Sequence, residues 1–134
     1  MQRTKNRPLA SGNITLLNAL IFTSILLFLG SSLMLYFSNI LTLLITTFGF
    51  IFYSLIYTIY LKWATPQNIV IGGLSGALPP LIGWTAVTNE ISLLPLTLVL
   101  IIFLWTPPHF WPLAIDRIDE YKKEGVPMLS LIHI

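Results

Sequence analysis

Long apolar runs separated by short polar breaks make up most of the chain. Four such runs occupy residues 14–37, 40–61, 69–87 and 91–108. Each is about as long as the roughly 20 apolar residues that a helix needs to cross a bilayer. None shows the alternation of polar and apolar residues found in strands of membrane barrels. The pattern therefore predicts an all-α, polytopic transmembrane helical bundle with about four spans.

The composition excludes several classes of protein. Hydrophobic residues make up 55% of the 134 residues and charged residues only 9%, whereas an ordinary soluble domain has about 25% charged residues. The net charge of +2 is small and the basic residues are scattered, which argues against nucleic acid as a partner. The chain has no cysteine, so disulfides and thiolate metal sites are excluded. We therefore expect the chain to lie in a lipid bilayer.

The basic residues predict the orientation in the membrane. All seven lie in the segments 1–13, 62–68 and 109–134, and the other connections carry none. Because basic loops stay on the cytoplasmic side, these three segments and both termini are predicted to be cytoplasmic.

Small residues and prolines interrupt two of the predicted spans. Gly72 and Gly76 form a pair that favours close packing of a neighbouring helix. Pro79–Pro80 and Pro107–Pro108 should kink or break their helices, because proline has no backbone N–H to donate.

Two basic clusters on the predicted cytoplasmic side could bind phosphate groups. The first contains Arg3, Lys5 and Arg7, and the second contains Lys62 with Tyr57 nearby. Arginine matches phosphate oxygens with two parallel hydrogen bonds, lysine adds a point charge, and tyrosine can donate a hydrogen bond. The alternative for the first cluster is a basic flank beside lipid headgroups. For the second it is an interfacial anchor of aromatic residues.

The third cluster is acidic. Asp116, Asp119 and Glu120 have the spacing i, i+3, i+4, which places all three carboxylates on one face of a helix. Mg²⁺ binds such carboxylates together with substrate phosphates. The alternative is a solvated helix end that the neighbouring basic residues partly neutralise.

His109 precedes Asp116 by seven residues, so it should lie about 10 Å deeper along the same helix. An intramembrane histidine is a candidate proton carrier, hydrogen-bond donor or haem-iron ligand. Alternatively, it caps carbonyls freed by Pro107–Pro108.

Several strings, in this order and spacing, resemble the protoheme IX farnesyltransferases (haem O synthases) of the UbiA prenyltransferase superfamily. The strings are 3–9 (RTKNRPL), 65–73 (TPQNIVIGG), 76–84 (GALPPLIGW), 105–111 (WTPPHFW), Tyr121 and 125–129 (GVPML). The resemblance implies a UbiA-like fold and the transfer of a farnesyl group from farnesyl diphosphate to a vinyl group of haem B, which yields haem O. It also implies Mg²⁺ as cofactor and a bacterial inner membrane rather than a mitochondrial one. Haem A synthase and other oxidase assembly proteins are the protein partners that it suggests.

By position, the resemblance makes Arg3, Arg7 and Lys62 contacts of the diphosphate, and His109 a candidate haem contact. It places Lys62, Asp116 and Asp119 in the catalytic site. Together with Glu120, the two aspartates occupy the region of the second acidic motif of the superfamily, which is degenerate in haem O synthases.

The chain departs from the family pattern at several places. The first acidic motif of the family would precede Arg3, the family has about nine spans, and the tail 130–134 is unlike the family. Trp63 and Pro112 stand where a basic residue and an alanine are expected. We therefore expect a piece of the enzyme, truncated at both ends, that does not turn over alone. Two alternatives stay open: a UbiA-type enzyme with a quinone-precursor or chlorin acceptor, and a small membrane protein that is not an enzyme.

Overall fold

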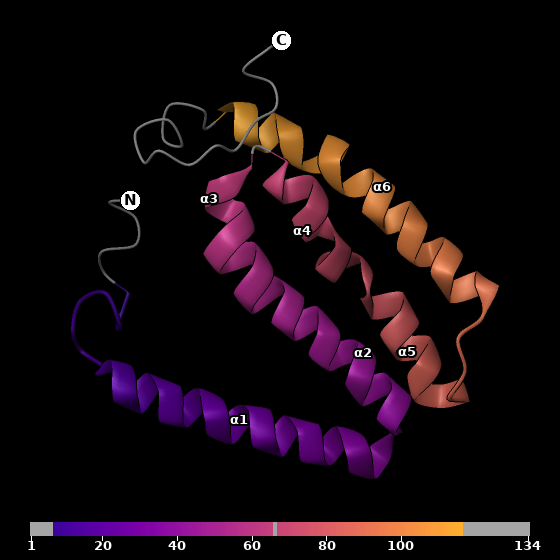
Figure 1. The fold of residues 1–134 in the computed structure, drawn as a ribbon, viewed down its shortest axis with the longest axis horizontal. Helices are drawn as coiled ribbons and strands as arrows, with labels where there is room; N and C mark the ends of the chain where they lie inside the picture. The colour runs from indigo at the N-terminus through magenta and orange to yellow at the C-terminus, as the bar shows by residue number, and fades with distance from the viewer. Residues whose placement is uncertain (1–6, 66, 117–134) are drawn as a thin grey trace. The chain divides into compact units, whose positions relative to one another are not determined.

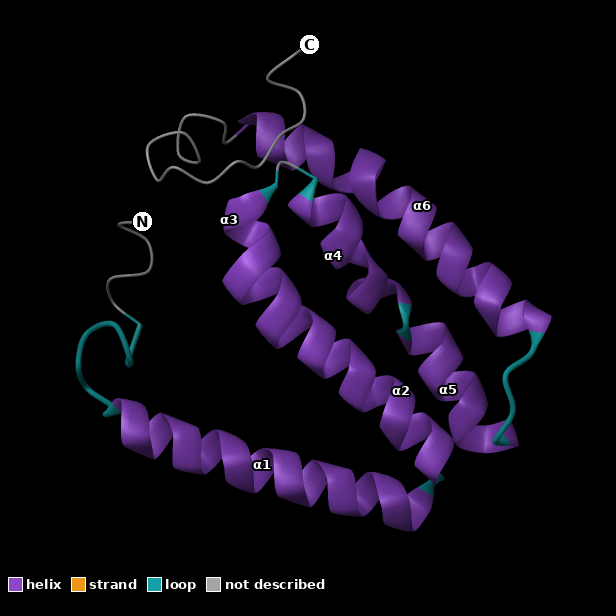
Figure 2. Ribbon diagram, viewed as in Figure 1, coloured by secondary structure: helices purple, strands orange, loops and turns teal. Residues whose placement is uncertain are grey.

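The chain is helical in all of the long segments that the structure describes. The structure is a computed structural model that describes residues 7–65 and 67–116. Figure 2 shows helices and connecting loops in this part of the chain. The elements are α1 (Leu16–Phe37), α2 (Ile40–Ile51), the π-helix η2 (Phe52–Leu61), α3 (Lys62–Ala64), α4 (Asn68–Ala77), α5 (Pro79–Thr88) and α6 (Leu93–Asp116).

These elements form four helical stretches that are long and apolar enough to cross a membrane. By length and composition the candidate spans of the described residues are Leu16–Phe37, Ile40–Ala64, Asn68–Thr88 and Leu93–Pro112. The prediction of an all-α protein with about four membrane spans is therefore confirmed.

The chain divides into two compact units, Met1–Ser38 and Asn39–Ile134. In the first unit, Thr15 caps α1 by accepting a hydrogen bond from the backbone N–H of Asn18 at 3.2 Å. The hydroxyl groups of Thr23 and Ser32 donate to carbonyls of the preceding turn, both at 2.8 Å. No residue of α1 is buried against protein.

In the second unit, three helical stretches run alternately up and down (Figure 1). The continuous stretch α2–η2–α3 runs one way, α4 and α5 return beside it, and α6 packs along α4 and α5. The end where α3 stops, α4 begins and α6 finishes is called the Lys62 end below. The buried core between the helices consists of Ala77, Leu78, Leu81 and Val99.

The proline pair Pro79–Pro80 interrupts the third span, as predicted. Helix α4 ends at Ala77, and the two prolines occupy the first two positions of α5. Proline is favoured there, because the first N–H groups of a helix have no intrahelical partner. The Leu78 N–H instead donates to the Ser75 carbonyl at 3.4 Å.

The pair Pro107–Pro108 does not end the fourth helix. Helix α6 continues through both residues and through Pro112 to Asp116, so it extends past the predicted end at residue 108. Each proline removes its own N–H and its ring crowds the carbonyl of residue i−4, yet the helix continues through both. Close packing against α4 at Thr106 supports the same turn.

The three glycines of α4 differ in which residues lie next to them. A Cβ added to Gly72 would meet the Tyr57 ring of η2, and one added to Gly73 would lie 2.9 Å from Thr106 Cγ2 of α6. Gly76 has no neighbour within 4 Å of such a Cβ. The predicted packing role thus applies to Gly72 but not to Gly76, and Gly73 provides the second close approach.

A buried polar cluster joins the start of α2 to the end of α5. The Asn39 side chain caps α2 by accepting from the Thr42 N–H at 2.9 Å, and its Nδ2 donates to the Thr85 carbonyl at 2.7 Å. The hydroxyls of Thr42 and Thr85 lie 3.0 Å apart, and both residues are almost fully buried. This cluster fixes the two helices at the end of the unit opposite the Lys62 end.

Candidate site at the Lys62 end

The structure describes five of the nine predicted site residues. Tyr57, Lys62, His109 and Asp116 belong to the second unit. Arg7 belongs to the first unit, where it is exposed and its carbonyl accepts from the Ser11 N–H at 2.8 Å. The remaining four lie outside the described residues: Arg3, Lys5, Asp119 and Glu120.

Tyr57 lies in η2, where the helix has the wide turns of a π-helix. Such segments are rare and occur frequently at functional sites. The Tyr57 ring stacks on that of Tyr53 with 5.3 Å between centroids, and it also lies close to Gly72 of α4. The absence of a side chain at Gly72 therefore lets the Tyr57 ring lie against the backbone of α4.

Lys62 is the first residue of α3 and is half-buried. It therefore continues the second helix, although the sequence placed it in the connection 62–68. A lysine near a helix C-terminus is favourable, because the last carbonyls carry partial negative charge. Its ammonium group lies 5.5 Å from the centroid of the Trp63 ring. That distance is within the range of a cation–π interaction.

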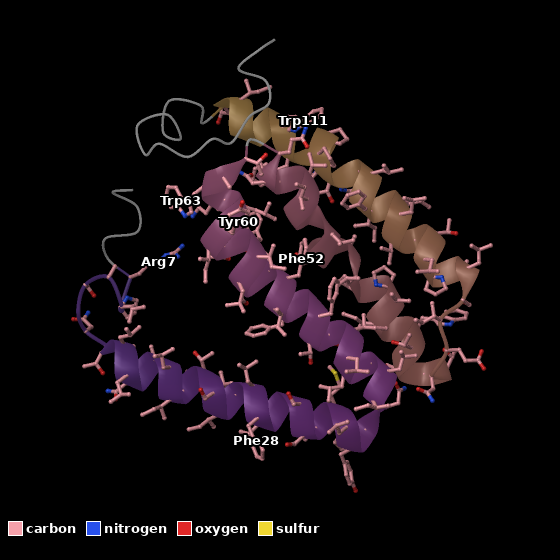
Figure 3. All side chains as sticks on the ribbon, in the orientation of Figure 1. Arg7, Phe28, Phe52, Tyr60, Trp63 and Trp111 are labelled. Atoms are coloured by element: carbon pink, nitrogen blue, oxygen red, sulfur yellow. The ribbon has the colours of Figure 1, made fainter. Side chains whose placement is uncertain are left out.

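Aromatic side chains surround this lysine at the end of the helix. Trp63 is 55% exposed and Tyr60 is 68% exposed, and Figure 3 shows both at the Lys62 end. This arrangement agrees with the alternative of an interfacial anchor. It does not exclude a phosphate contact, because a half-buried ammonium group can serve an anion while its stem lies against the rings.

The connection after α3 is tied to the helices at both sides. The Thr65 N–H donates to the Leu61 carbonyl at 3.3 Å, and the Asn68 N–H donates to the Thr65 carbonyl at 3.2 Å. Asn68 is fully buried, and its Nδ2 donates to the Lys62 carbonyl at 3.4 Å. The first turn of α4 therefore holds the backbone of Lys62.

His109 and Asp116 lie on the same helix, as the sequence predicted. Because α6 continues from Leu93 to Asp116, the seven residues between them correspond to about 10 Å along the helix axis. His109 is exposed on α6, and its ring centroid lies 6.0 Å from that of Trp105. Asp116 is exposed at the end of the helix, which belongs to the Lys62 end (Figure 1).

The carboxylate of Asp116 is chemically suited to bind Mg²⁺. Carboxylate oxygens are the ligands that this ion prefers, and Asp116 forms no ion pair with another described residue. Asp119 and Glu120, the other two carboxylates of the predicted cluster, lie outside the described residues. Lys62 and Asp116 thus give the Lys62 end a cation and a carboxylate, the two kinds of group needed to hold a metal-bound diphosphate.

Comparison with known proteins identifies the family. The profile of the UbiA prenyltransferase family matches residues 1–133, nearly the whole chain. The chain belongs to the UbiA prenyltransferase family. This membership agrees with the all-α fold and the four candidate membrane spans, and the chain is an integral membrane protein.

Individual relatives within the UbiA family are similar over nearly all of the chain. It is 58% identical to the protoheme IX farnesyltransferase of Alcanivorax borkumensis and 59% identical to that of Shewanella oneidensis. It is 56% identical to protoheme IX farnesyltransferase 1 of Pseudomonas fluorescens. Each alignment covers 99% of this chain but only 44% of the relative. No solved structure matches the chain.

Two residues that contact Tyr57 and Lys62 were not singled out as site residues from the sequence. Asn68 lies in the string 65–73 that carries the family resemblance, but nothing in its spacing indicated a bond to Lys62. Gly72 was predicted to pack against a helix, without a partner. Such contacts depend on how η2 and α4 are placed side by side, which the sequence pattern does not specify.

Proposed function

We propose that this chain is part of a protoheme IX farnesyltransferase, in which the farnesyl group of farnesyl diphosphate is transferred to a vinyl group of haem B, diphosphate leaves and water adds, so that haem O with a hydroxyethylfarnesyl chain results. The observation that carries the proposal is the identity of 56% to 59% with proteins of that name over 99% of the chain. The chain spans 44% of the length of these relatives, so the complete site includes residues that lie outside it.

The residues of the Lys62 end divide into two roles in this reaction. Lys62 would attract the diphosphate and stabilise the negative charge that develops on it as the bond to the farnesyl carbon breaks. The Tyr57 hydroxyl, if it faces the same oxygens, would donate a hydrogen bond. By the family resemblance, Arg3, Lys5 and Arg7 remain candidate contacts of the diphosphate.

Asp116, Asp119 and Glu120 would hold Mg²⁺ beside the diphosphate. When bound, this ion neutralises charge on the phosphate oxygens and so makes the diphosphate a better leaving group. The apolar helices below would shield the farnesyl group from water, which would otherwise react with the cation before the vinyl group does.

His109 supports the haem part of the proposal. It lies about 10 Å from Asp116 along α6, which is toward the middle of the membrane if the Lys62 end is cytoplasmic. An exposed imidazole at that depth can approach the propionates or the iron of a haem. Because relatives with this name occur in bacteria, the bacterial inner membrane is the proposed location, with haem A synthase and other oxidase assembly proteins as candidate partners.

Binding of inorganic diphosphate in the presence of Mg²⁺ tests the site. The chain in detergent should bind diphosphate only when Mg²⁺ is present, and Asp116→Asn with Asp119→Asn should weaken the binding at least about tenfold, because each carboxylate is a charged ligand. Glu90→Gln is the matched control, since Glu90 is exposed in the loop between α5 and α6, at the end opposite Lys62. Equal affinity of the double variant and the unmodified chain would refute the metal assignment.

The acceptor needs a separate test. A relative of full length that carries the residues of this chain should convert farnesyl diphosphate and haem B into a product with the mass of haem O. A product formed only with a quinone precursor or a chlorin would instead support the sibling enzyme. We expect the isolated chain to bind diphosphate without forming haem O, because it lacks more than half of the length of its relatives.

A further inference from the structure

Helix α4 contacts the second helical stretch at two points near the proposed diphosphate site. Asn68 and Gly72 are four residues apart, so they lie on one face of α4. Tyr57 and Lys62 are five residues apart, and in a π-helix the hydrogen bonds join residues of that spacing. In this stretch the Lys62 N–H donates to the Tyr57 carbonyl. The Tyr57 ring meets Gly72, and the Lys62 carbonyl accepts from the Asn68 side chain.

The first contact controls the backbone at Lys62. The Lys62 N–H donates to the carbonyls of Tyr57 and Tyr60 within the continuous helix, and its carbonyl faces the first turn of α4. The fully buried Asn68 side chain donates to the Lys62 carbonyl at 3.4 Å. A buried amide that bonds a backbone carbonyl fixes the direction in which the chain leaves the helix, and with it the origin of the lysine side chain.

The second contact controls the Tyr57 ring. A Cβ at position 72 would overlap the Tyr57 ring, with 2.6 Å to Cε2 and less to Cδ2. A separation below 3.0 Å requires something to move, and the ring is stacked on Tyr53 on its other side. Any side chain at position 72 would therefore displace the Tyr57 ring.

We propose that Asn68 and Gly72 are positioning residues for the diphosphate site, because they hold the Lys62 backbone and the Tyr57 ring against α4. This inference rests on the proposed function, since it assumes that Lys62 and Tyr57 contact the diphosphate. The two α4 residues do not touch the anion themselves. They act through the placement of residues that do.

Two variants and two matched controls test the proposal. Asn68→Ala removes the bond to the Lys62 carbonyl, and Gly72→Ala displaces the Tyr57 ring. Gln67→Ala and Gly76→Ala are the controls, since Gln67 is exposed and Gly76 has open space around its Cα. The affinity of the chain for inorganic diphosphate with Mg²⁺ should fall about tenfold in the first pair, comparable to the loss of one charge-assisted hydrogen bond. It should stay unchanged in the controls.

A double-variant cycle separates positioning from a general loss of stability. In a Lys62→Met background, Asn68→Ala should change the affinity less than about twofold, because residues that act through one another are not additive. A general loss of structure would instead weaken binding by the same factor in both backgrounds, and that outcome would overturn the proposal. Far-UV circular dichroism checks the helix content of each variant. If Gly72→Ala does not form helical protein, the double-variant cycle of Asn68→Ala with Lys62→Met tests the proposal by itself.

The outcomes also separate this inference from the proposed function. If Lys62→Met itself leaves diphosphate affinity unchanged, the proposed site fails and the inference fails with it. If Lys62→Met weakens binding but Asn68→Ala and Gly72→Ala do not, the site stands and only the positioning role is overturned.

Discussion

The polar cluster at the start of α2 provides the sharpest test of how the second unit is held together. Asn39 performs two tasks with one side chain: its Oδ1 caps α2 at the Thr42 N–H, and its Nδ2 donates to the Thr85 carbonyl of α5. The two tasks can be separated. Asn39→Ser keeps a capping oxygen, since serine is as good an N-cap as asparagine, but serine is too short to reach α5. Asn39→Ala removes both the cap and the bond.

The expected losses follow from the two bonds. Hydrogen bonds between membrane helices contribute about 0.6 kcal/mol on average and up to about 1.7 kcal/mol. At 2.7 Å the bond from Asn39 to Thr85 is short, so Asn39→Ser should lower the free energy of unfolding by about 1 kcal/mol. Asn39→Ala should cost about 1 kcal/mol more, which is the usual contribution of an N-cap.

Reversible unfolding in mixed micelles measures these differences. The chain would be titrated with a denaturing detergent while far-UV circular dichroism follows helix content. The order of stability should be the unmodified chain, then Asn39→Ser, then Asn39→Ala. If Asn39→Ser is as stable as the unmodified chain, the bond between the helices contributes nothing and only the cap matters. If the two variants are equally unstable, the cap contributes nothing.

Two further predictions concern α4 and the lysine. Gly73→Ala should lower the free energy of unfolding by about 1–3 kcal/mol, as overpacking does, because the added Cβ would press on Thr106. The same measurement on Gly76→Ala should show no loss of stability. Equal losses in the two variants would contradict this difference in packing. Trp63→Leu should raise the affinity for inorganic diphosphate about two- to fivefold, because it removes a cation–π attraction of about 0.5–1 kcal/mol that competes for the Lys62 ammonium group. Titration calorimetry with Mg²⁺ checks this, and a fall in affinity would show that Trp63 supports the site instead.

The fold class and the positions of the spans could be predicted from the sequence because apolar length is a direct physical requirement of the bilayer. The predicted spans 14–37 and 69–87 agree closely with α1 and with α4–α5. The second helix continues past residue 61 because a lysine near a helix end does not stop it. The fourth continues past residue 108 although its prolines remove N–H donors and crowd the preceding turn.

The site could be predicted less completely. Charge spacing and the family resemblance indicated Lys62 and Asp116, and the structure places both at one end of the second unit. The π-helix at Tyr57 and the bond from Asn68 to Lys62 could not be predicted, because neither has a periodic signature in the sequence. The cap at Asn39 could have been found, since asparagine before an apolar run is a usual helix start. Its partner Thr85 could not, because 46 residues separate them.

The hydrogen bonds within α1 have a consequence for how the protein is inserted into the membrane. The hydroxyl groups of Thr23 and Ser32 donate to carbonyls of the same helix, and no residue of α1 is buried. A helix whose backbone hydrogen bonds are satisfied within the segment can enter lipid from the translocation channel. Insertion of α1 can therefore be completed during synthesis, before the ribosome has released α2. The helices that depend on one another, α2 and α4–α6, would then assemble later within the bilayer.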